Sequence, residues 1–253
     1  WKQNRVKIIR RYCDKMLVVF PFEVDFYRNH GIEVEFVGHP LLDEISPENS
    51  MEIQRQKFGI QSDELVVGIM PGSRKVEIKN HLATQLQVAN ALALKHPKVR
   101  LALLVAPSFS KDYFEDKVAG LSSPLIVMKD DPLKMIQMVD LMLAASGTAT
   151  LMVGLLKKPM VVIYKMSALT AFILKCIVKS KFFCIVNLIL NREVVPERFQ
   201  GAANVPHLID LMNKYIVSSD ERKRTSAELE ELWNKLGSKG ATSRVVKALK
   251  EYL

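Results

Sequence analysis

The segment Asp140-Leu-Met-Leu-Ala-Ala-Ser-Gly-Thr-Ala-Thr150 decides how the rest of the chain is interpreted. Its apolar first half predicts a buried strand. Ser146 and Gly147 then predict a tight turn, and Thr148 and Thr150 flank the start of an apolar helix. The segment therefore predicts a strand, a turn and a helix in immediate succession.

Such a turn directs backbone N–H groups and the positive end of a helix dipole at whatever lies above it. Small residues let an anion approach the backbone closely. We interpret the segment as a cradle for a diphosphate. The alternative is an ordinary helix N-cap made by Ser146 or Thr148.

Strand and helix patterns alternate around this segment. Further apolar runs that predict strands lie at residues 65–70, 99–105, 125–128 and 160–164. Helical patterns lie between them at residues 77–95, 109–119 and 132–139. This alternation predicts an α/β fold with a doubly wound parallel sheet and right-handed crossovers. Ligands of such sheets bind beyond the carboxyl ends of the strands, where the loop 71–74 also falls.

The two ends of the chain are richer in helix. A helix, a strand, a helix and a strand are predicted at residues 2–14, 16–20, 22–30 and 33–37. Gly38-His39-Pro40 then predicts a turn, and we expect a domain boundary near residues 38–46. The last helices are predicted at residues 205–215, 220–236 and 241–252.

The most apolar stretch of the chain, residues 168–190, is long enough to raise the question of a membrane span. Lys175, Lys179 and Lys181 interrupt it. Each lysine costs about 2.5–3.5 kcal/mol in the middle of a membrane helix. We therefore expect a buried helix followed by a strand at residues 182–186.

Composition and charge narrow the class of protein. The chain has 253 residues, of which 49% are hydrophobic and 25% charged, as in packed soluble proteins. The net charge is +9, and the first fifteen residues hold six basic side chains against Asp14 alone. This start suits an anionic membrane surface or phosphate-rich ligands, although a solvated helix face is an equal alternative. No nucleic-acid-binding motif is present, so we expect no nucleic-acid partner.

Cysteine and histidine usage indicates neither disulfides nor a metal site. The three cysteines form no C-x-x-C pair, which fits reduced thiols in a cytoplasm. The five histidines lack metal-ligand spacing, so no structural zinc is expected. The chain begins at Trp1 without a signal peptide, and we expect a fragment or a processed product.

Two groups of polar residues are candidates for binding. Arg74 follows a predicted strand and can grip a phosphate with two N–H donors, or it is a surface arginine beside Glu77. Its loop is not a Walker A motif, and no G-x-G-x-x-G is present, which argues against nicotinamide cofactors. The second group suits ribose, base or phosphate contacts, or the capping of a helix start by its glutamates: Asn187, Arg192, Glu193 and Glu197.

Five segments in order resemble the lipid-A-disaccharide synthases, inverting glycosyltransferases of the GT-B fold. They are Phe-Pro-Phe-Glu (20–23), Phe-Val-Gly-His-Pro-Leu (36–41), Pro-Gly-Ser-Arg (71–74), Ser-Gly-Thr-Ala-Thr (146–150) and Asn-Arg-Glu-Val-Val-Pro-Glu (191–197). The resemblance covers nearly the whole chain. The first residues of the chain, Trp1 to Arg5, resemble a segment from the middle of such proteins. The resemblance therefore implies that most of an N-terminal domain lies upstream.

The resemblance implies three parts and a reaction. The parts are the end of an acceptor domain with a hinge (1–44), a UDP-sugar-binding domain (45–210) and C-terminal helices (211–253) that cross back or are exchanged within a homodimer. The reaction joins UDP-2,3-diacylglucosamine to 2,3-diacylglucosamine 1-phosphate (lipid X) and releases UDP. The resemblance also implies that no cofactor or metal is needed. It implies a location in the cytoplasm, on the surface of the inner membrane.

The resemblance also assigns residues to UDP. The diphosphate would contact the first loop and the central turn, namely Gly72, Ser73, Arg74, Ser146, Gly147, Thr148, Ala149 and Thr150. Tyr164 and Met166 would line the uracil pocket through their backbone, and Asn187, Arg192, Glu193 and Glu197 would contact UDP more loosely. The family's general base would lie upstream of Trp1, so no catalytic residue is assigned here.

Two alternatives remain. One is another GT-B enzyme, such as a peptidoglycan GlcNAc transferase or a UDP-GlcNAc 2-epimerase. The other is a UDP-binding or membrane-docking module that is inactive alone, which the missing base and the basic start favour.

Overall fold

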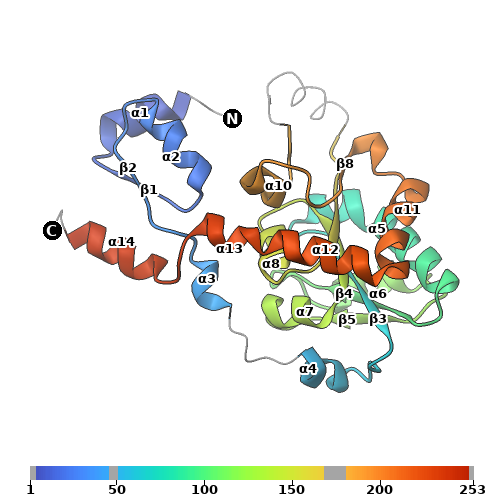
Figure 1. Cartoon of the computed structure of the whole chain (residues 1–253). Coiled ribbons are helices and arrows are strands. Elements are labelled where there is room, and N and C mark those ends of the chain that lie inside the picture. Colours follow the sequence, from blue (N-terminus) through green and yellow to red (C-terminus); the bar gives the residue numbers. More distant parts are fainter. Residues whose placement is uncertain (1–3, 46–50, 168–180, 251–253) are drawn as a thin grey trace.

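Two parallel sheets, each with its own helices, make up the protein (Figure 1). The computed structural model describes residues 4–45, 51–167 and 181–250. The smaller sheet has two strands and the larger has six. Every pair of neighbouring strands is parallel, as the alternation of strand and helix patterns predicts.

The N-terminal unit contains the smaller sheet. Its elements are α1 (Asn4–Tyr12), β1 (Met16–Val18), α2 (Pro21–Arg28) and β2 (Val34–Phe36). Pro21 occupies the first turn of α2, where its missing N–H costs nothing. The four predicted elements of this region are confirmed, each a little shorter than expected.

The six-stranded sheet has the order β5-β4-β3-β6-β7-β8. Its strands are β3 (Leu65–Met70), β4 (Val99–Leu104), β5 (Leu125–Met128), β6 (Leu141–Ala145), β7 (Met160–Tyr164) and β8 (Glu197–Phe199). From β3 the chain first builds outward through β4 and β5, and then returns to the other side of β3. The order therefore reverses between β3 and β6, and a crevice opens at the carboxyl ends of these two strands.

Helices cover both faces of this sheet. One face packs against α5 (Lys75–Lys95), α6 (Asp112–Val118) and α11 (Val205–Val217). The other packs against α7 (Pro132–Met138), α8 (Ala149–Leu155), α10 (Ile185–Leu190), α12 (Ser219–Leu229) and α13 (Glu231–Leu236). Alternate strand residues face opposite layers: Val67 and Ile69 contact the first and Val66 the second. Burial on both faces explains why the strands read as continuous apolar runs.

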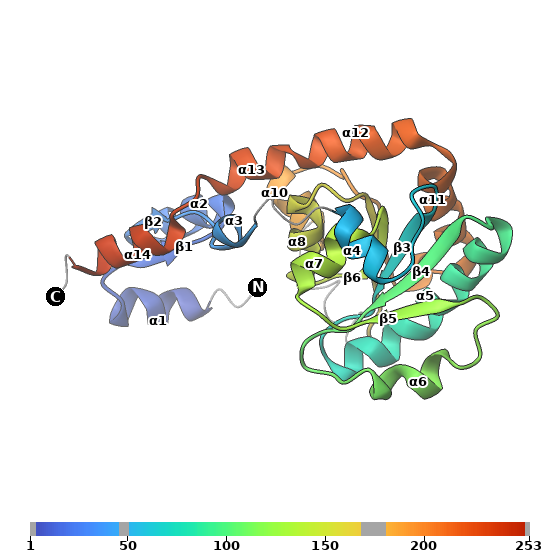
Figure 2. The same cartoon turned by 90° about the horizontal axis from the view of Figure 1, so that it is seen from below.

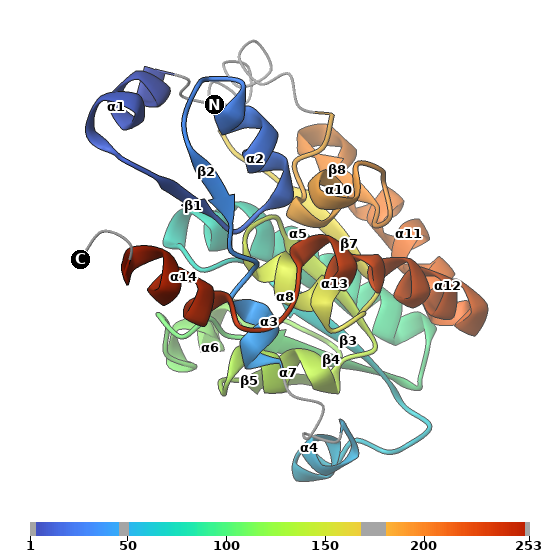
Figure 3. The same ribbon diagram turned by 60° about the vertical axis from the view of Figure 1, so that its left-hand side comes forward.

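The C-terminal helices run from the six-stranded unit to the N-terminal unit (Figure 2). The chain between the units includes α3 (Leu41–Glu44) and is followed by α4 (Met51–Lys57). After α13, the last described helix, α14 (Ala241–Lys250), lies beside the smaller sheet and α3 (Figure 3). The Nε of Arg244 donates to the carbonyl of Val37 at 2.8 Å, and the N–H of His39 donates to the carbonyl of Leu236 at 3.2 Å.

Two sequence predictions are wrong, and one strand was not predicted. In place of the strand at 182–186, residues 182–184 are irregular and α10 begins at Ile185. The carboxylate of Glu197 accepts the N–H groups of Phe183 and Cys184 just before this helix. Glu197 itself lies in β8, a strand that the sequence did not predict. The long helix at 220–236 is two helices that part at Glu230.

The predicted helix within residues 168–180 falls outside the described part of the chain. In the ranges that are described, no helix combines the length and the apolar character needed to cross a bilayer.

Candidate functional site

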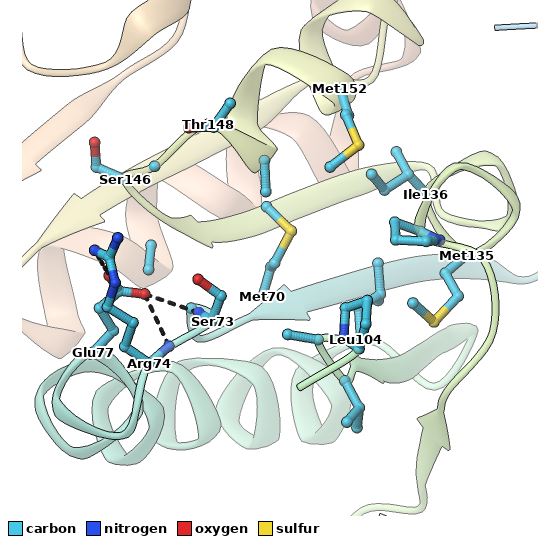
Figure 4. Close-up of a pocket in the computed structure, with 18 of the residues that line it drawn as sticks. Met70, Ser73, Arg74, Glu77, Leu104, Met135, Ile136, Ser146, Thr148 and Met152 are labelled. Carbon is cyan, nitrogen blue, oxygen red and sulfur yellow. Dashed lines mark hydrogen bonds and ion pairs between the residues drawn. The ribbon is translucent and has the colours of Figure 1, made fainter. Parts of the chain in front are cut away.

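A cavity of about 560 Å³ opens where the strand order reverses (Figure 4). Its two principal walls are the loop after β3 and the turn after β6. Eight of the predicted site residues line it: Gly72, Ser73, Arg74, Ser146, Gly147, Thr148, Ala149 and Tyr164. The structure thus brings together loops that are more than seventy positions apart in the sequence.

The turn after β6 is held by bonds that leave three of its amides open. The N–H of Ser146 donates to the carbonyl of Ile163 at 2.9 Å, and the Oγ1 of Thr150 donates to the carbonyl of Gly147 at 2.7 Å. Among the residues that the structure describes, the N–H groups of Gly147, Thr148 and Ala149 meet no acceptor. Three consecutive donors on a cavity wall suit an anion.

The hydroxyls of this turn do not make the alternative N-cap. Thr148 is the N-cap residue of α8, but its side chain makes no capping bond. The Oγ of Ser146 donates to the carbonyl of Phe183 at 3.1 Å, which ties the turn to the segment before α10. Thr150 is fully buried behind the turn and supports it without lining the cavity.

The loop after β3 encloses a carboxylate of its own. The Oε2 of Glu77 accepts the N–H of Ser73 at 2.8 Å and that of Arg74 at 3.3 Å, while its Oε1 accepts the Arg74 guanidinium at 3.0 Å. The side chain of Arg74 is 81% exposed. Both interpretations of Arg74 therefore remain physically available, since it lines the cavity and is also paired with Glu77.

Tyr164 and Met166 differ in their surroundings. The Tyr164 ring lines the cavity and stacks on His81 and Phe183, with centroids 6.1 and 6.0 Å away. Met166 is outside the lining, and both of its backbone groups are engaged by Gln200. Its N–H donates to Oε1 at 3.2 Å, and its carbonyl accepts from Nε2 at 3.0 Å.

The second group of predicted residues lies apart from the cavity lining. Asn187 is fully buried, where its Oδ1 accepts the N–H groups of Val194 and Val195 at 2.9 and 3.1 Å and its Nδ2 donates to the carbonyl of Val195 at 2.8 Å. Arg192 makes a two-bond contact with Glu231 on α13, at 2.8 and 2.9 Å. These side chains fasten the turn between α10 and β8.

Glu193 and Glu197 complete this group. Glu193 accepts from the guanidinium of Arg198 at 2.8 Å. Glu197 accepts the N–H groups of Phe183 at 3.1 Å and Cys184 at 2.6 Å. Burial raises the pKa of the Glu197 carboxyl above its ordinary value, although these two N–H donors oppose the shift.

Several cavity residues were not singled out in the sequence. Apolar side chains form its floor and far wall, among them Leu104, Met135, Ile136 and Met152 (Figure 4). Gln85 lies behind the crevice, and its Nε2 donates to the carbonyls of Met70 on β3 and Leu143 on β6, at 3.2 and 3.0 Å. The contribution of the end of β4 to the cavity was predictable, because all parallel strands end at the same edge of the sheet. The contributions of α5 and α7 to the lining depend on tertiary packing.

The chemistry of the cavity is that of a site for an anion joined to a less polar group. Open amides and one guanidinium lie at one end and apolar side chains at the other. Among the described residues, no group of His, Cys, Asp and Glu side chains is arranged to hold a metal ion.

The comparison with known proteins identifies the family. The family model for lipid-A-disaccharide synthetase matches residues 1–251. The chain belongs to this family. Lipid-A-disaccharide synthase of Geobacter metallireducens is 35% identical over 253 residues, and the match covers 100% of the chain and 66% of that relative's length. The resemblance read from the five segments is thereby confirmed.

Solved structures support the fold. A putative UDP-N-acetylglucosamine 2-epimerase from Listeria monocytogenes has a TM-score of 0.64 at 10% identity, covering 94% of this chain and 59% of its own. A glycosyltransferase involved in lipopolysaccharide biosynthesis has a TM-score of 0.54 at 15% identity, covering 85% and 57%. The prediction of an α/β fold of GT-B type is confirmed.

Proposed function

We propose that the cavity binds UDP and that this chain carries the nucleotide-binding part of a lipid-A-disaccharide synthase. The reaction would join UDP-2,3-diacylglucosamine to lipid X and release UDP. The observation that carries the proposal is the set of three open N–H groups at Gly147–Ala149 on the wall of a cavity at the sheet's switch point. Membership of the family supplies the reaction.

The diphosphate would lie between the two loops. The amides of Gly147, Thr148 and Ala149 would donate to it from one side, and Arg74 with its loop from the other. Negative charge develops on the departing UDP during glycosyl transfer, so fixed donors at this position would stabilise the transition state. The apolar side chains of the cavity would face the less polar parts of the ligand.

The remaining site assignments are weaker. Thr150 would act through the turn that it supports. The backbone of Met166 would contact the uracil base only if Gln200 released it. The bonds of Asn187, Arg192, Glu193 and Glu197 favour a supporting role, and their contacts with UDP remain predictions. We assign no general base to a residue of this chain.

The parts and partners of the whole protein belong to the same proposal. The division into 1–44, 45–210 and 211–253 would separate the acceptor side, the nucleotide side and the helices that connect them. Lipid X and the inner-membrane surface would be approached from the acceptor side. A homodimer with exchanged C-terminal helices is the alternative to helices that cross back within one chain.

Two measurements on one sample test this proposal. Calorimetry should detect UDP binding. A radiolabelled transfer assay should detect no disaccharide, because we assign the general base to no residue of this chain. Failure to bind UDP would refute the assignment of the cavity. Disaccharide formation by this chain would refute the second expectation and show that one of its residues acts as the base.

A further inference from the structure

The loop between β3 and α5 is built around a negative charge that belongs to the protein. Gly72 has a φ of +120°, and a Cβ placed there would lie 2.6 Å from both the Cβ and the Oε2 of Glu77. Glycine therefore permits the loop to close on this side chain. The three donors of Ser73 and Arg74 all point at the Glu77 carboxylate (Figure 4).

A phosphate group would use the same donors. Backbone N–H groups and a guanidinium bind carboxylate and phosphate oxygens in the same way. One set of donors cannot satisfy both anions at full strength, and a second negative charge beside the first is repelled. Among the described residues that line the cavity, Arg74 and Glu77 are the only charged side chains, so their pairing leaves no net side-chain charge for an anionic ligand.

The turn after β6 offers the opposite situation. Its amides at 147–149 have no internal acceptor, whereas those at 73 and 74 already have one. The Arg74–Glu77 pair is largely exposed on the arginine side, and such pairs are weak enough to exchange partners readily.

From these contacts we infer that Glu77 is an internal competitor for the diphosphate and sets the affinity of the cavity for it. This inference rests on the proposed UDP site. When the ligand binds, Arg74 and the amides of its loop transfer from the Glu77 carboxylate to a phosphate oxygen. When it leaves, the carboxylate takes the donors back. The residue thus weakens product binding.

The test compares Glu77→Gln with wild type by calorimetry, using UDP, uridine and inorganic pyrophosphate. Glutamine keeps an oxygen for the Ser73 N–H but removes the charge. We expect UDP and pyrophosphate to bind about tenfold more tightly to the variant, and uridine to bind equally well to both proteins. Glu77→Ala should also bind pyrophosphate more tightly. If the carboxylate only organised the loop, Glu77→Ala would bind pyrophosphate more weakly.

A matched control is available on the opposite edge of the sheet. Glu64 accepts the N–H of Gln61 at 2.8 Å and pairs with Arg100 at 2.8 Å, but it does not line the cavity. Glu64→Gln should therefore leave all three affinities unchanged. The inference would be overturned if pyrophosphate bound no more tightly to Glu77→Gln than to wild type. The same holds if pyrophosphate bound to neither protein. Absence of UDP binding together with tighter pyrophosphate binding to Glu77→Gln would instead overturn only the proposed function.

Discussion

The two groups of polar residues that the sequence marks for UDP end up in opposite situations. Around the cavity, the amides of 147–149 have no internal acceptor, and Arg74 is 81% exposed in its pair with Glu77. In α10 and β8, the side chains of Asn187 and Glu197 bond to backbone groups of the fold. Open or exposed donors near strand ends thus remain available to a ligand, whereas buried polar atoms that are fully paired serve the fold.

The difference has a physical origin. A buried polar group must be paired within the protein, since an unsatisfied one costs about 1–3 kcal/mol. Asn187 is fully buried and therefore has to be satisfied internally. Thr148 and Gly147 are exposed, so water or a ligand can complete their bonds.

The largest expected effect is on the stability of the second group. Asn187→Ala removes three hydrogen bonds from buried backbone groups and leaves a small cavity. We expect the free energy of unfolding to fall by about 3–4 kcal/mol. Urea denaturation followed by circular dichroism measures this loss.

A matched control uses Asn90, which accepts one bond, from the N–H of Ser123 at 3.1 Å, and is only half-buried. Asn90→Ala should cost about 1 kcal/mol. Equal losses for the two variants, or an Asn187→Ala protein that is stable but no longer binds UDP, would contradict the separation of the two groups.

An intermediate effect depends on pH. Burial raises the pKa of Glu197 above its ordinary value near 4.5, so the folded protein holds this proton more tightly than the unfolded chain does. The stabilisation that comes from this tighter proton binding is fully present below the ordinary pKa. It is lost as the pH rises through the raised pKa. Wild type should therefore lose stability relative to Glu197→Gln as the pH rises from about 4.5. A stability difference between the two proteins that does not change with pH would contradict this prediction.

The smallest effect is expected at Arg192. Its contacts with Glu231 and Glu228 involve side chains that are about two-fifths exposed. Arg192→Ala should cost about 0–1 kcal/mol of stability and leave UDP binding unchanged. A loss of UDP affinity with unchanged stability would return Arg192 to the ligand site.

The sequence predicted most of the fold because strands and helices repeat with clear periods. The bounds of β3, β5, β6 and β7 agree with the predicted runs to the residue, since each is a continuous apolar run. Of these, β3, β6 and β7 are mostly buried, and the edge strand β5 is partly buried. The start of α10 was missed because the segment before it is held by Glu197, thirteen positions away from Cys184. A partner so distant leaves no mark in the local pattern.

The candidate site was predictable to the same degree. Loops at strand ends meet at one edge, so Ser73 and Thr148 were placed together correctly from topology alone. The pairing of Glu77 with Arg74 was visible in the sequence as an alternative, because the two residues are three positions apart at a helix start. The burial of Asn187 depends on the packing of α8, α10 and α13, which no single segment encodes.

The most direct test of the proposed cavity is a pair of titrations, with UDP and with uridine, on wild type and Arg74→Ala. A charge-assisted contact with the diphosphate is worth about 1.5–3 kcal/mol, so the variant should lose about 10- to 150-fold in affinity for UDP and nothing for uridine. Arg100→Ala, which removes an arginine paired with Glu64 away from the cavity, should change neither affinity. Equal losses for UDP and uridine in Arg74→Ala, or no loss for either, would contradict a diphosphate site at this cavity.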